Sequence, residues 1–465
     1  MVYNSSLDND TWYVLAEGRE IVTNGIYYED HLSMHEGLEV TVQNYGFAAI
    51  FYLIYSALGP VGIYIGMLLL NLLLCYLIYK ICMVLSNKNE NLSLLIMILT
   101  DLLLGQWFVV TRAQMVSFCI MMLLIYLLEL YIRTDKTKYL WWIPLLSFLQ
   151  INLHASLWPM IIIVLAVYII DSFKSKKLHL QGYRTKPLLL VLTASFAVGF
   201  LNPYGFKMMT FIFTSYGVPE AQEYINELKA FRPFAANTGI LFYSSVVLAM
   251  LCYIFGKNQN IRMRWLMLIF GFLALGINTI KGMSQLILVL LFPLAAVYKD
   301  FKIDKKYKNI CIMAASWVGI LAVSAIVATA AVGIPDMIDG PSEELIEAMD
   351  KIDESVGSGD KKALKVYADF NNGGFVEYRG YKSYIDSRME VFIKSNNGKE
   401  DIFQEYYYVG SKDGLSKQEF LDKYNFDYLV IYDYDILFDL DDENYELLHE
   451  IKDKDGETTI RVYKR

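Results

Sequence analysis

Two aspartates near the start of the chain, Asp8 and Asp10, are the first residues whose type and spacing could do chemistry. Carboxylates separated by one residue can hold a divalent metal ion, and a single carboxylate can take a proton from a substrate hydroxyl. A bare Asp-x-Asp pair is a weak signal, because an aspartate also caps helices. The pair therefore predicts either a catalytic or metal-binding motif or a structural cap.

Four further polar residues stand among apolar ones: Arg112 and Gln114 in TRAQ, His154 in INLHAS, and Lys281 at the end of an apolar run. They are candidate substrate-binding residues, because a guanidinium or ammonium group can hold phosphate oxygens. The alternative for Arg112 and Lys281 is an interfacial cation whose charge reaches water. For His154 the alternative is a hydrogen-bonded structural histidine.

The stretch DTWYVLAEGREIVTNG (10–25) must position the aspartates, and its pattern predicts a helix. Apolar residues recur at helical spacing, and Asn24 with Gly25 supplies a stop signal. Trp12 and Tyr13 suit a helix at a membrane–water boundary. An interfacial anchor helix is therefore one interpretation, and the lip of a membrane-facing active site is the other.

Long apolar runs dominate the chain before residue 334, and 55% of the 465 residues are apolar. A bilayer-spanning helix needs about 20 mainly apolar residues. The sequence predicts about ten crossings, several of them short: 60–84, 92–110, 114–132, 140–153, 156–171, 188–204, 239–256, 265–280, 283–298 and 309–332. The apolar stretch 47–58 is too short to cross and is predicted to lie along the interface.

Lysine and arginine concentrate in alternate loops, for example in 174–186 and 299–308. Such loops stay on the cytoplasmic side, so the N-terminal stretch and the C-terminal region are both predicted to face outward. An even number of crossings agrees with this, because it leaves both ends on one side. The sequence shows no basic surface for nucleic acid, and membrane lipid is the expected surrounding partner.

Three regions follow from these patterns: an outward acidic loop with interfacial helices (1–59), a transmembrane domain (60–333), and a soluble extracytoplasmic α/β domain (334–465). In the last region Ser342 is predicted to cap a helix. Asp386 and Arg388, in YIDSRMEVF, are predicted to form an ion pair on one strand face. Four stretches predict strands of a mixed sheet: ALKVYADF (363–370), GFVEY (374–378), DYLVIY (427–432) and TTIRVY (458–463).

The order of short motifs carries a resemblance over nearly the whole chain. The motifs are DNDTWYVLAEGREIVTNGI, TRAQMVSFCI, INLHASLW, FLNPYG and FNNGGFVEYRGYKSYIDSRMEVF. In this order they resemble polytopic glycosyltransferases of the GT-C superfamily, especially a largely uncharacterised bacterial branch similar to protein mannosyltransferases. The resemblance implies an α-helical polytopic membrane protein of about ten spans with a small C-terminal extracytoplasmic α/β domain.

The resemblance also implies roles for residues. Asp10, with Asp8 as the lesser candidate, would act as general base on an acceptor hydroxyl or hold a divalent metal such as Mg²⁺ or Mn²⁺. The donor would be a polyprenyl-phosphate sugar, and inversion at the anomeric carbon is expected. The family normally has a spanning helix before the acidic loop, and Met1 falls almost where that helix would end. We expect that the start lies upstream or that the protein works without this helix.

The sequence therefore predicts an enzyme of the hexosyltransferase type in the cell membrane. It would transfer a sugar from a lipid-linked donor to an extracytoplasmic acceptor, neither of which has a fingerprint in the sequence. Two alternatives remain: a transporter or flippase of lipid-linked glycans, and a non-enzymatic cell-envelope membrane protein. Internal repeats and charges near mid-membrane would favour the transporter.

Overall fold

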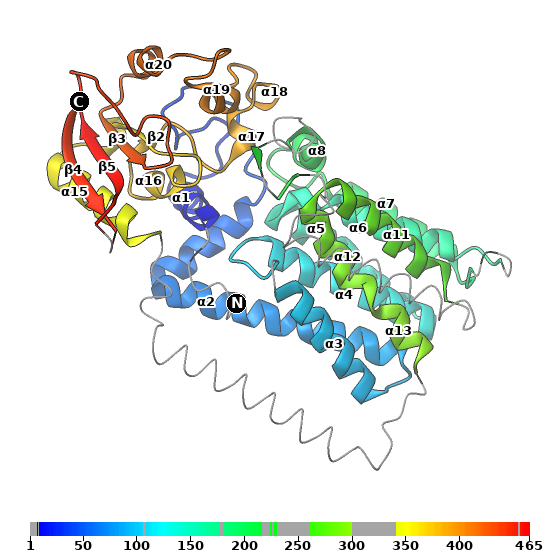
Figure 1. The fold of residues 1–465 in the computed structure, drawn as a ribbon. Helices are drawn as coiled ribbons and strands as arrows, with labels where there is room; N and C mark the ends of the chain where they lie inside the picture. The colour runs from blue at the N-terminus through cyan, green and yellow to red at the C-terminus, as the bar shows by residue number, and fades with distance from the viewer. Residues whose placement is uncertain are drawn as a thin grey trace. The chain divides into compact units, whose positions relative to one another are not determined.

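The computed structural model describes residues 7, 9–105, 108–175, 178, 180–215, 224–225, 227–229, 261–299, 341–453 and 456–465. The chain divides into two compact units, drawn in Figure 1. The helical unit comprises Met1–Ser5, Tyr64–Met209 and Ala221–Ile338. The α/β unit comprises Ser6–Ile63, Thr210–Glu220 and Asp339–Arg465, so it joins the beginning of the chain to its end. Most of the described residues are helical, and the strands form one small sheet.

Apolar helices build the helical unit. Its described helices are α3 (Glu90–Gly105), α4 (Gln114–Thr134), α5 (Ile143–Leu153), α6 (Pro159–Asp171), α7 (Thr185–Val198), α11 (Met263–Asn278), α12 (Met283–Leu290) and α13 (Phe292–Val297), with short 3-10 turns η1 (Thr137–Trp142), η2 (Ala155–Leu157) and η3 (Ile280–Gly282). Helices α2 (Tyr45–Leu85) and α8 (Phe206–Ser215) each run from one unit into the other. Within the described residues, three helical runs are long and apolar enough to cross a membrane: Tyr45–Leu85, Gln114–Thr134 and Ile280–Val297.

Eight of the predicted crossings fall on described residues, and each of them is mainly helical. Several of the helices, such as α7 and α11, are shorter than a full bilayer span. The predicted crossings 239–256 and 309–332 lie outside the described residues. The stretch 47–58 forms the first part of α2, which is interrupted at Gly59, where φ is +62°, just before Pro60. Glycine tolerates this φ and proline begins the next helical segment, so the pair explains the kink.

The α/β unit contains a mixed sheet of five described strands in the order β2-β1-β3-β5-β4. The strands are β1 (Lys365–Tyr367), β2 (Lys382–Ser383), β3 (Tyr428–Tyr432), β4 (Glu446–Lys452) and β5 (Thr458–Lys464). β1 pairs in parallel with β2 and β3, whereas β5 pairs antiparallel with β3 and β4. Short helices surround the sheet: α15 (Glu343–Val356), α16 (Gly373–Tyr378), α17 (Met389–Phe392), α18 (Lys394–Asn397), α19 (Ile402–Tyr408), α20 (Lys417–Tyr424) and the 3-10 turn η4 (Lys361–Ala363).

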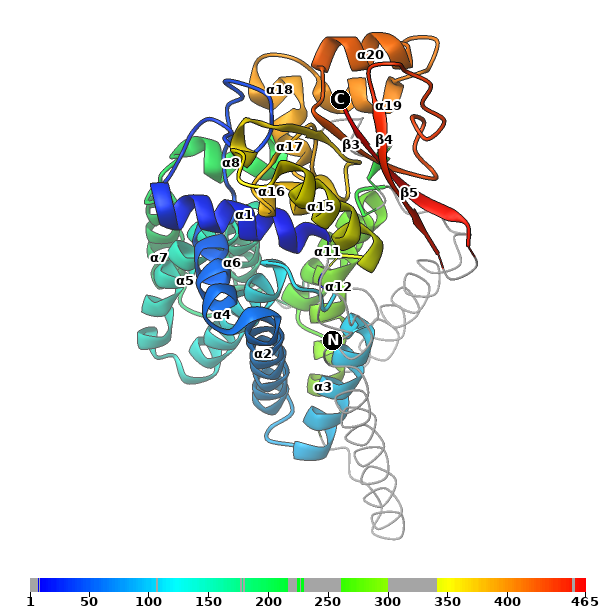
Figure 2. The same cartoon turned by 90° about the vertical axis from the view of Figure 1, so that its left-hand side faces the viewer.

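The N-terminal helix α1 (Asn9–Asn24) belongs to the α/β unit and packs along α16 (Figure 2). Trp12 is buried against the rings of Phe375 and Tyr378, so it holds the helix to α16. Arg19 donates to the carbonyl oxygens of Glu377 and Tyr378 at 2.9 and 2.8 Å, which satisfies the open end of α16. These contacts bind together residues about 360 positions apart in the sequence.

The structure confirms several local predictions and corrects two. Ser342 caps α15, and three of the four predicted strands form. The prediction of a strand at 374–378 is wrong, because this stretch is helix α16. Asp369 starts it by accepting the backbone N–H groups of Asn371 and Asn372, which turns the chain.

The second correction concerns Asp386 and Arg388. They form the predicted ion pair, but they lie in the loop between β2 and α17 rather than on a strand. Gly373 makes room for this loop, because a Cβ atom there would lie 1.7 Å from the carbonyl oxygen of Ile385. Gly374 similarly lies against the backbone of Tyr13 in α1. Two adjacent glycines therefore let α1, α16 and the loop approach closely.

Candidate functional site

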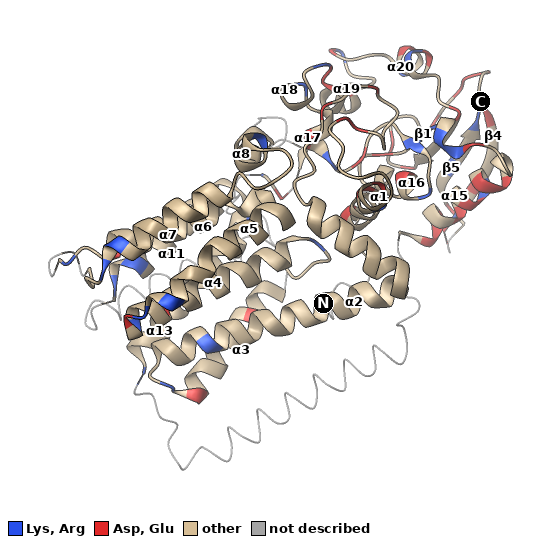
Figure 3. Ribbon diagram, turned by 180° about the vertical axis from the view of Figure 1, so that it is seen from behind, with Lys and Arg blue, Asp and Glu red and all other residues tan. Residues whose placement is uncertain are grey.

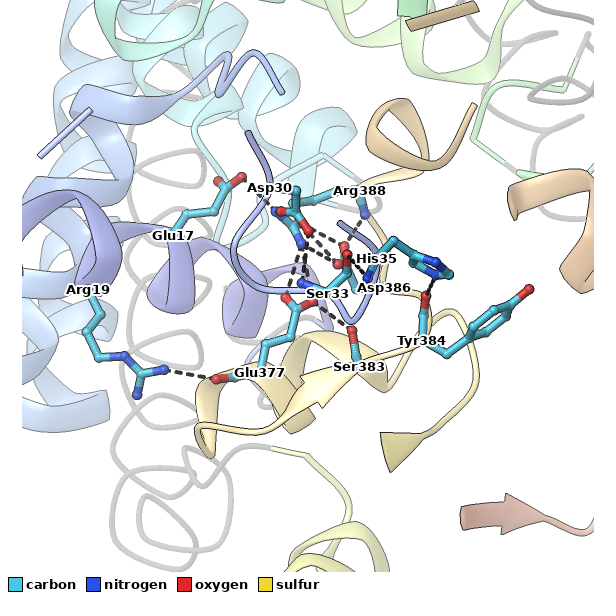
Figure 4. Close-up of polar contacts among 10 residues, drawn as sticks. All are labelled: Glu17, Arg19, Asp30, Ser33, His35, Glu377, Ser383, Tyr384, Asp386 and Arg388. Atoms are coloured by element: carbon cyan, nitrogen blue, oxygen red, sulfur yellow. Dashed lines mark hydrogen bonds and ion pairs between the residues drawn. The ribbon is translucent and has the colours of Figure 1, made fainter. Parts of the chain in front are cut away.

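The most charged buried place in the described α/β unit is centred on Arg388, of which 1% is exposed (Figure 4). Its guanidinium lies 2.7 Å from Asp30, 2.6 Å from Asp386, 3.2 Å from Glu377 and 3.7 Å from Glu17. These five residues are called the Arg388 cluster below. All four carboxylates are buried.

Four separate elements bring the cluster together. Glu17 comes from the middle of α1, Asp30 from the segment after it, Glu377 from α16, and Asp386 from the loop before α17. Local bonds fix the side chains: the backbone N–H of Ser33 donates to Asp30 at 2.8 Å, and the hydroxyl of Ser383 donates to Glu377 at 2.7 Å. The N-terminal acidic stretch is thereby built into the C-terminal part of the chain.

The charges in the cluster do not balance, because one guanidinium faces four carboxyl groups. Burial raises the pKa of Glu17 to about 8, even though Arg388 lowers it. Burial also raises the pKa of Glu377 well above its usual range, and a hydrogen bond with Asp386 adds to this. Burial alone would raise the pKa of Asp30 too, but Arg388 and Ser33 lower it. The cluster therefore holds protons at neutral pH.

Glu17 is the least satisfied member. Only its Oε1 approaches Arg388, and the buried Oε2 has no hydrogen-bond partner in the described parts of the chain. In Figure 4 its carboxyl group points toward Arg388 and Asp30. A buried carboxyl oxygen without a partner favours the protonated form, which agrees with the raised pKa.

Asp10 and Glu390 extend the acidic character beyond the cluster. Glu390 lies in α17, and its pKa is raised to about 7. Burial is the main cause and the charges of Asp386 and Asp10 contribute, whereas Arg388 opposes the shift. Asp10 stands in the first turn of α1, partly exposed, where a negative charge suits the helix N-terminus. Asp10 thus lies within electrostatic reach of a carboxyl group that changes its charge near neutral pH.

The structure describes only one of the two aspartates of the predicted metal site. Asp8 lies outside the described residues, so the structure places Asp10 alone of the predicted pair. Among the residues that are described, no group of three His, Cys, Asp or Glu side chains is arranged to hold a metal ion.

In the helical unit the predicted cations Arg112 and Lys281 come together on one carboxylate, Glu227. Arg112 donates to both oxygens of Glu227 at 3.0 Å, and the Lys281 ammonium lies 3.4 Å from one of them. Desolvation would raise the pKa of Glu227, but Lys281 and Arg112 lower it to about 2. The side chain of Glu227 is 47% exposed, so this two-cation group is open to water.

Gln114 and His154 occupy buried positions in the same unit. Gln114 begins α4 and donates to the hydroxyl of Ser284 at 3.2 Å. The two ring nitrogens of His154 lie 2.7 and 2.9 Å from the hydroxyls of Ser117 and Ser156. Both nitrogens are thus engaged by neutral partners, which favours the structural interpretation of His154.

Comparison with known proteins adds no family. No protein-family model matches the chain. No curated protein sequence is significantly similar to it. The assignment of a function therefore depends on the geometry of the chain itself.

Sequence reasoning singled out Asp386 and Arg388 but missed Glu17, Asp30 and Glu377. The sequence contains a weak indication for Glu17. It lies two helical turns after Asp10, so both carboxylates fall on the helix face that also carries the apolar Val14. No local pattern links Asp30 or Glu377 to Arg388, since the contacts join elements far apart in the chain.

Proposed function

We propose that the chain is a membrane glycosyltransferase that moves a sugar from a polyprenyl-phosphate donor to an extracytoplasmic acceptor. Asp10 takes the proton of the acceptor hydroxyl, the acceptor oxygen bonds to the anomeric carbon, and the bond from that carbon to the phosphate oxygen breaks. The polyprenyl phosphate leaves with the electron pair, and the anomeric carbon is inverted. Asp8 remains the second candidate for this role or for holding a metal.

The apolar surface of the described helices supports a place in the membrane. On α2 and α3 a series of large apolar side chains is exposed, which is costly in water and favourable in lipid. They are Val61, Ile65, Leu68, Leu69, Leu72 and Leu73 on α2, and Leu94, Leu95, Ile98, Leu99 and Leu102 on α3. About ten crossings, as predicted from the sequence, would continue this surface.

The Arg388 cluster supports a common side for the two ends of the chain. Asp30 and Glu17 precede the predicted crossings, and Arg388 follows them, yet the three meet in one buried group. Buried partners cannot lie on opposite sides of a bilayer, so the number of crossings between them must be even. Together with the basic loops, this supports an extracytoplasmic position for both the N-terminal stretch and the C-terminal domain.

The observation that carries the proposed role of Asp10 is its electrostatic link to Glu390. A general base works best when its proton affinity is matched to the operating pH. Burial raises the pKa of Glu390 to about 7 and the charge of Asp10 contributes to this, so a carboxyl group that titrates near neutral pH lies within electrostatic reach of Asp10. Asp10 is the partly exposed member at the helix N-terminus, where a substrate can reach it.

The two-cation group of the helical unit suits the donor phosphate. Arg112 and Lys281 are held apart from each other by the carboxylate of Glu227, which both contact. A phosphate group offers the same paired oxygens, so it can replace Glu227 between the two cations. Gln114, beside Ser284 near this group, is proposed to line the donor site, whereas His154 is proposed to support its wall.

The test is sugar release by the purified full chain in lipid vesicles. A panel of polyprenyl-phosphate hexoses would be supplied with and without EDTA, and Asp10→Asn would be compared with the wild type. The matched control is Glu20→Gln, which removes a carboxylate from the same helix. Among the described residues this carboxylate accepts a hydrogen bond from Asn24, four positions away. We expect the rate to fall about a hundredfold or more in Asp10→Asn and to stay unchanged in the control.

The other outcomes of this experiment test the metal requirement and the alternative functions. A loss of rate with EDTA that Mg²⁺ or Mn²⁺ restores would assign a metal to the site. No release from any donor, with protein that remains folded, would overturn the proposal. Movement of the lipid-linked sugar across the vesicle membrane without cleavage would then favour a transporter or flippase.

A further inference from the structure

A pocket of about 530 Å³ opens in the helical unit where several helices end. Its lining comes from the end of α2, the end of α4, the start of α11 and the region of α13. Four cations and one carboxylate line it: Arg133, Arg262, Arg264, Lys299 and Glu129. Figure 3 shows Lys and Arg gathered at this end of the helices, around the labels α11 and α13.

Arg264 forms the floor of the pocket and is fully engaged. Its guanidinium contacts both oxygens of Glu129 at 2.8 and 3.0 Å, Asp171 at 2.9 Å and Gln181 at 2.7 Å. Arg264 with Glu129 and Asp171 carries one net negative charge when all three are ionised. This triad fixes the shape of the pocket, but it does not supply a free cation.

The other three cations lie at the mouth of the pocket, where they are exposed. Arg133 donates to the carbonyl oxygen of Val84 and, at 2.7 Å, to the amide oxygen of Asn87. Both acceptors are neutral, so they hold the guanidinium in place without cancelling its charge. No carboxylate of the described residues forms an ion pair with Arg133, Arg262 or Lys299.

The rest of the lining combines two polar side chains, Asn87 and Gln181, with a larger set of apolar ones. The apolar residues include Leu85, Ile132, Trp265, Pro293 and Val297. A pocket that combines three exposed cations, one of them held in place by neutral acceptors, with apolar side chains suits an anion that carries an apolar body. Basic pockets between membrane helices on the cytoplasmic side bind lipid phosphate groups in this way. The loops around the pocket are among those that the sequence predicts to be cytoplasmic.

We propose that this pocket binds a phosphate group, with Arg133, Arg262 and Lys299 contacting its oxygens. The group belongs either to the head of an anionic lipid or to a soluble phosphate compound. The site is separate in sequence and composition from Arg112 and Lys281, so it does not depend on the proposed transferase reaction.

Two probes distinguish the sources, both with the purified full chain. Titration calorimetry with inorganic pyrophosphate tests soluble phosphate. Native mass spectrometry, after reconstitution into phosphatidylcholine nanodiscs with phosphatidic acid, tests the lipid head. The variant is Arg133→Gln with Arg262→Gln, and the control is Lys186→Gln, an exposed cation of the same unit outside the pocket.

We expect one of the two probes to bind the wild type. Its affinity for the double variant should be lower by a factor of about ten or more, because charge-assisted hydrogen bonds are lost. The control should bind as the wild type does. Single changes at Arg262 and Lys299 break no ion pair among the described residues, so these variants should remain folded and each weaken binding severalfold. Wild type that binds neither probe, or equal losses in the double variant and the control, would overturn the proposal.

Discussion

Two buried arginines of this chain sit in contrasting charge environments. Arg264, in the helical unit, meets two carboxylates, Glu129 and Asp171, and all of its nitrogens are satisfied. Arg388, in the α/β unit, meets four carboxyl groups, and one oxygen of Glu17 has no hydrogen-bond partner among the described residues. Both arginines are almost completely buried.

This difference indicates that the ion pairs of Arg264 are structural, whereas carboxyl groups around Arg388 can gain or lose protons. Around Arg264 the hydroxyl of Tyr168 donates to Glu129 at 2.7 Å, and the backbone N–H of Gln181 donates to Asp171 at 3.3 Å. Both carboxylates there therefore have a cationic partner and a further hydrogen bond. Around Arg388 the surplus of carboxyl groups forces some of them to keep protons, as the raised pKa values of Glu17 and Glu377 indicate.

The largest effect is expected from removing Arg388 itself. Arg388→Gln leaves four buried carboxyl groups without a cation, so the free energy of unfolding of the α/β unit should fall by about 3–5 kcal/mol. Thermal unfolding and limited proteolysis after α1 would measure the loss. The matched control is Arg379→Gln, a part-exposed arginine that pairs with Asp350 and Asp353. A similar small loss in both variants would contradict the central role of Arg388.

A smaller loss of stability is expected from breaking the ion pairs of Arg264. Glu129→Gln removes the charge that accepts two bonds from Arg264 and one from Tyr168. The free energy of unfolding should fall by about 2–3 kcal/mol, because a hydrogen-bonded buried charge loses its partner. The midpoint of thermal unfolding of the reconstituted chain would report it. An unchanged midpoint would show that the triad is not structural.

Replacing the buried carboxyl group of Glu17 by an amide should instead increase the stability of the folded chain. The folded chain holds the Glu17 proton up to about pH 8, whereas the unfolded chain releases it near pH 4.5, so the wild type loses stability as pH rises through this window. Glu17→Gln keeps the group neutral and should raise the free energy of unfolding at pH 7 by about 2 kcal/mol. Its stability should depend less on pH between 5 and 8 than that of the wild type. A destabilised variant at pH 7 would show that Glu17 is ionised and paired.

These residues also show where sequence reasoning succeeds. The helix predicted from Asp10 to Gly25 forms as α1, because helical spacing and the stop at Asn24 and Gly25 are local signals. The predicted strands form where β-branched and aromatic residues alternate over a sufficient length, as in β3 and β5. GFVEY has the same composition, but a turn begun by Asp369 and two close glycines make it helical.

Long-range contacts account for what the sequence could not predict. Trp12 was expected at a membrane surface, yet it is buried against α16, whose position no local pattern reveals. In the sequence Glu17 and Asp30 resemble solvated acids of an amphipathic segment. In the structure both meet Arg388, which lies 358 positions from Asp30. The pairing of Arg112 with Lys281 likewise depends on Glu227, in a segment distant from both.

The smallest effect is expected at Glu227, the half-exposed carboxylate that Arg112 and Lys281 both contact. Glu227→Gln should lower the free energy of unfolding at pH 7 by less than about 1 kcal/mol, because the carboxylate is half-exposed and screened by water. The carboxylate contribution of the wild type should disappear as pH falls from about 4.5 toward 2, the lowered pKa of Glu227. Thermal unfolding across this pH range would follow it. A loss of several kcal/mol at pH 7 would mean that the group is structural and not open to a phosphate.

The proposed reaction depends most directly on the carboxylate of Asp10. The decisive measurement is the single-turnover rate of sugar release from a polyprenyl-phosphate hexose by reconstituted wild type and Asp10→Asn at equal amounts of folded protein. Loss of a general base predicts a rate at least about a hundredfold lower in the variant. Equal rates in the two proteins would contradict the assignment of Asp10.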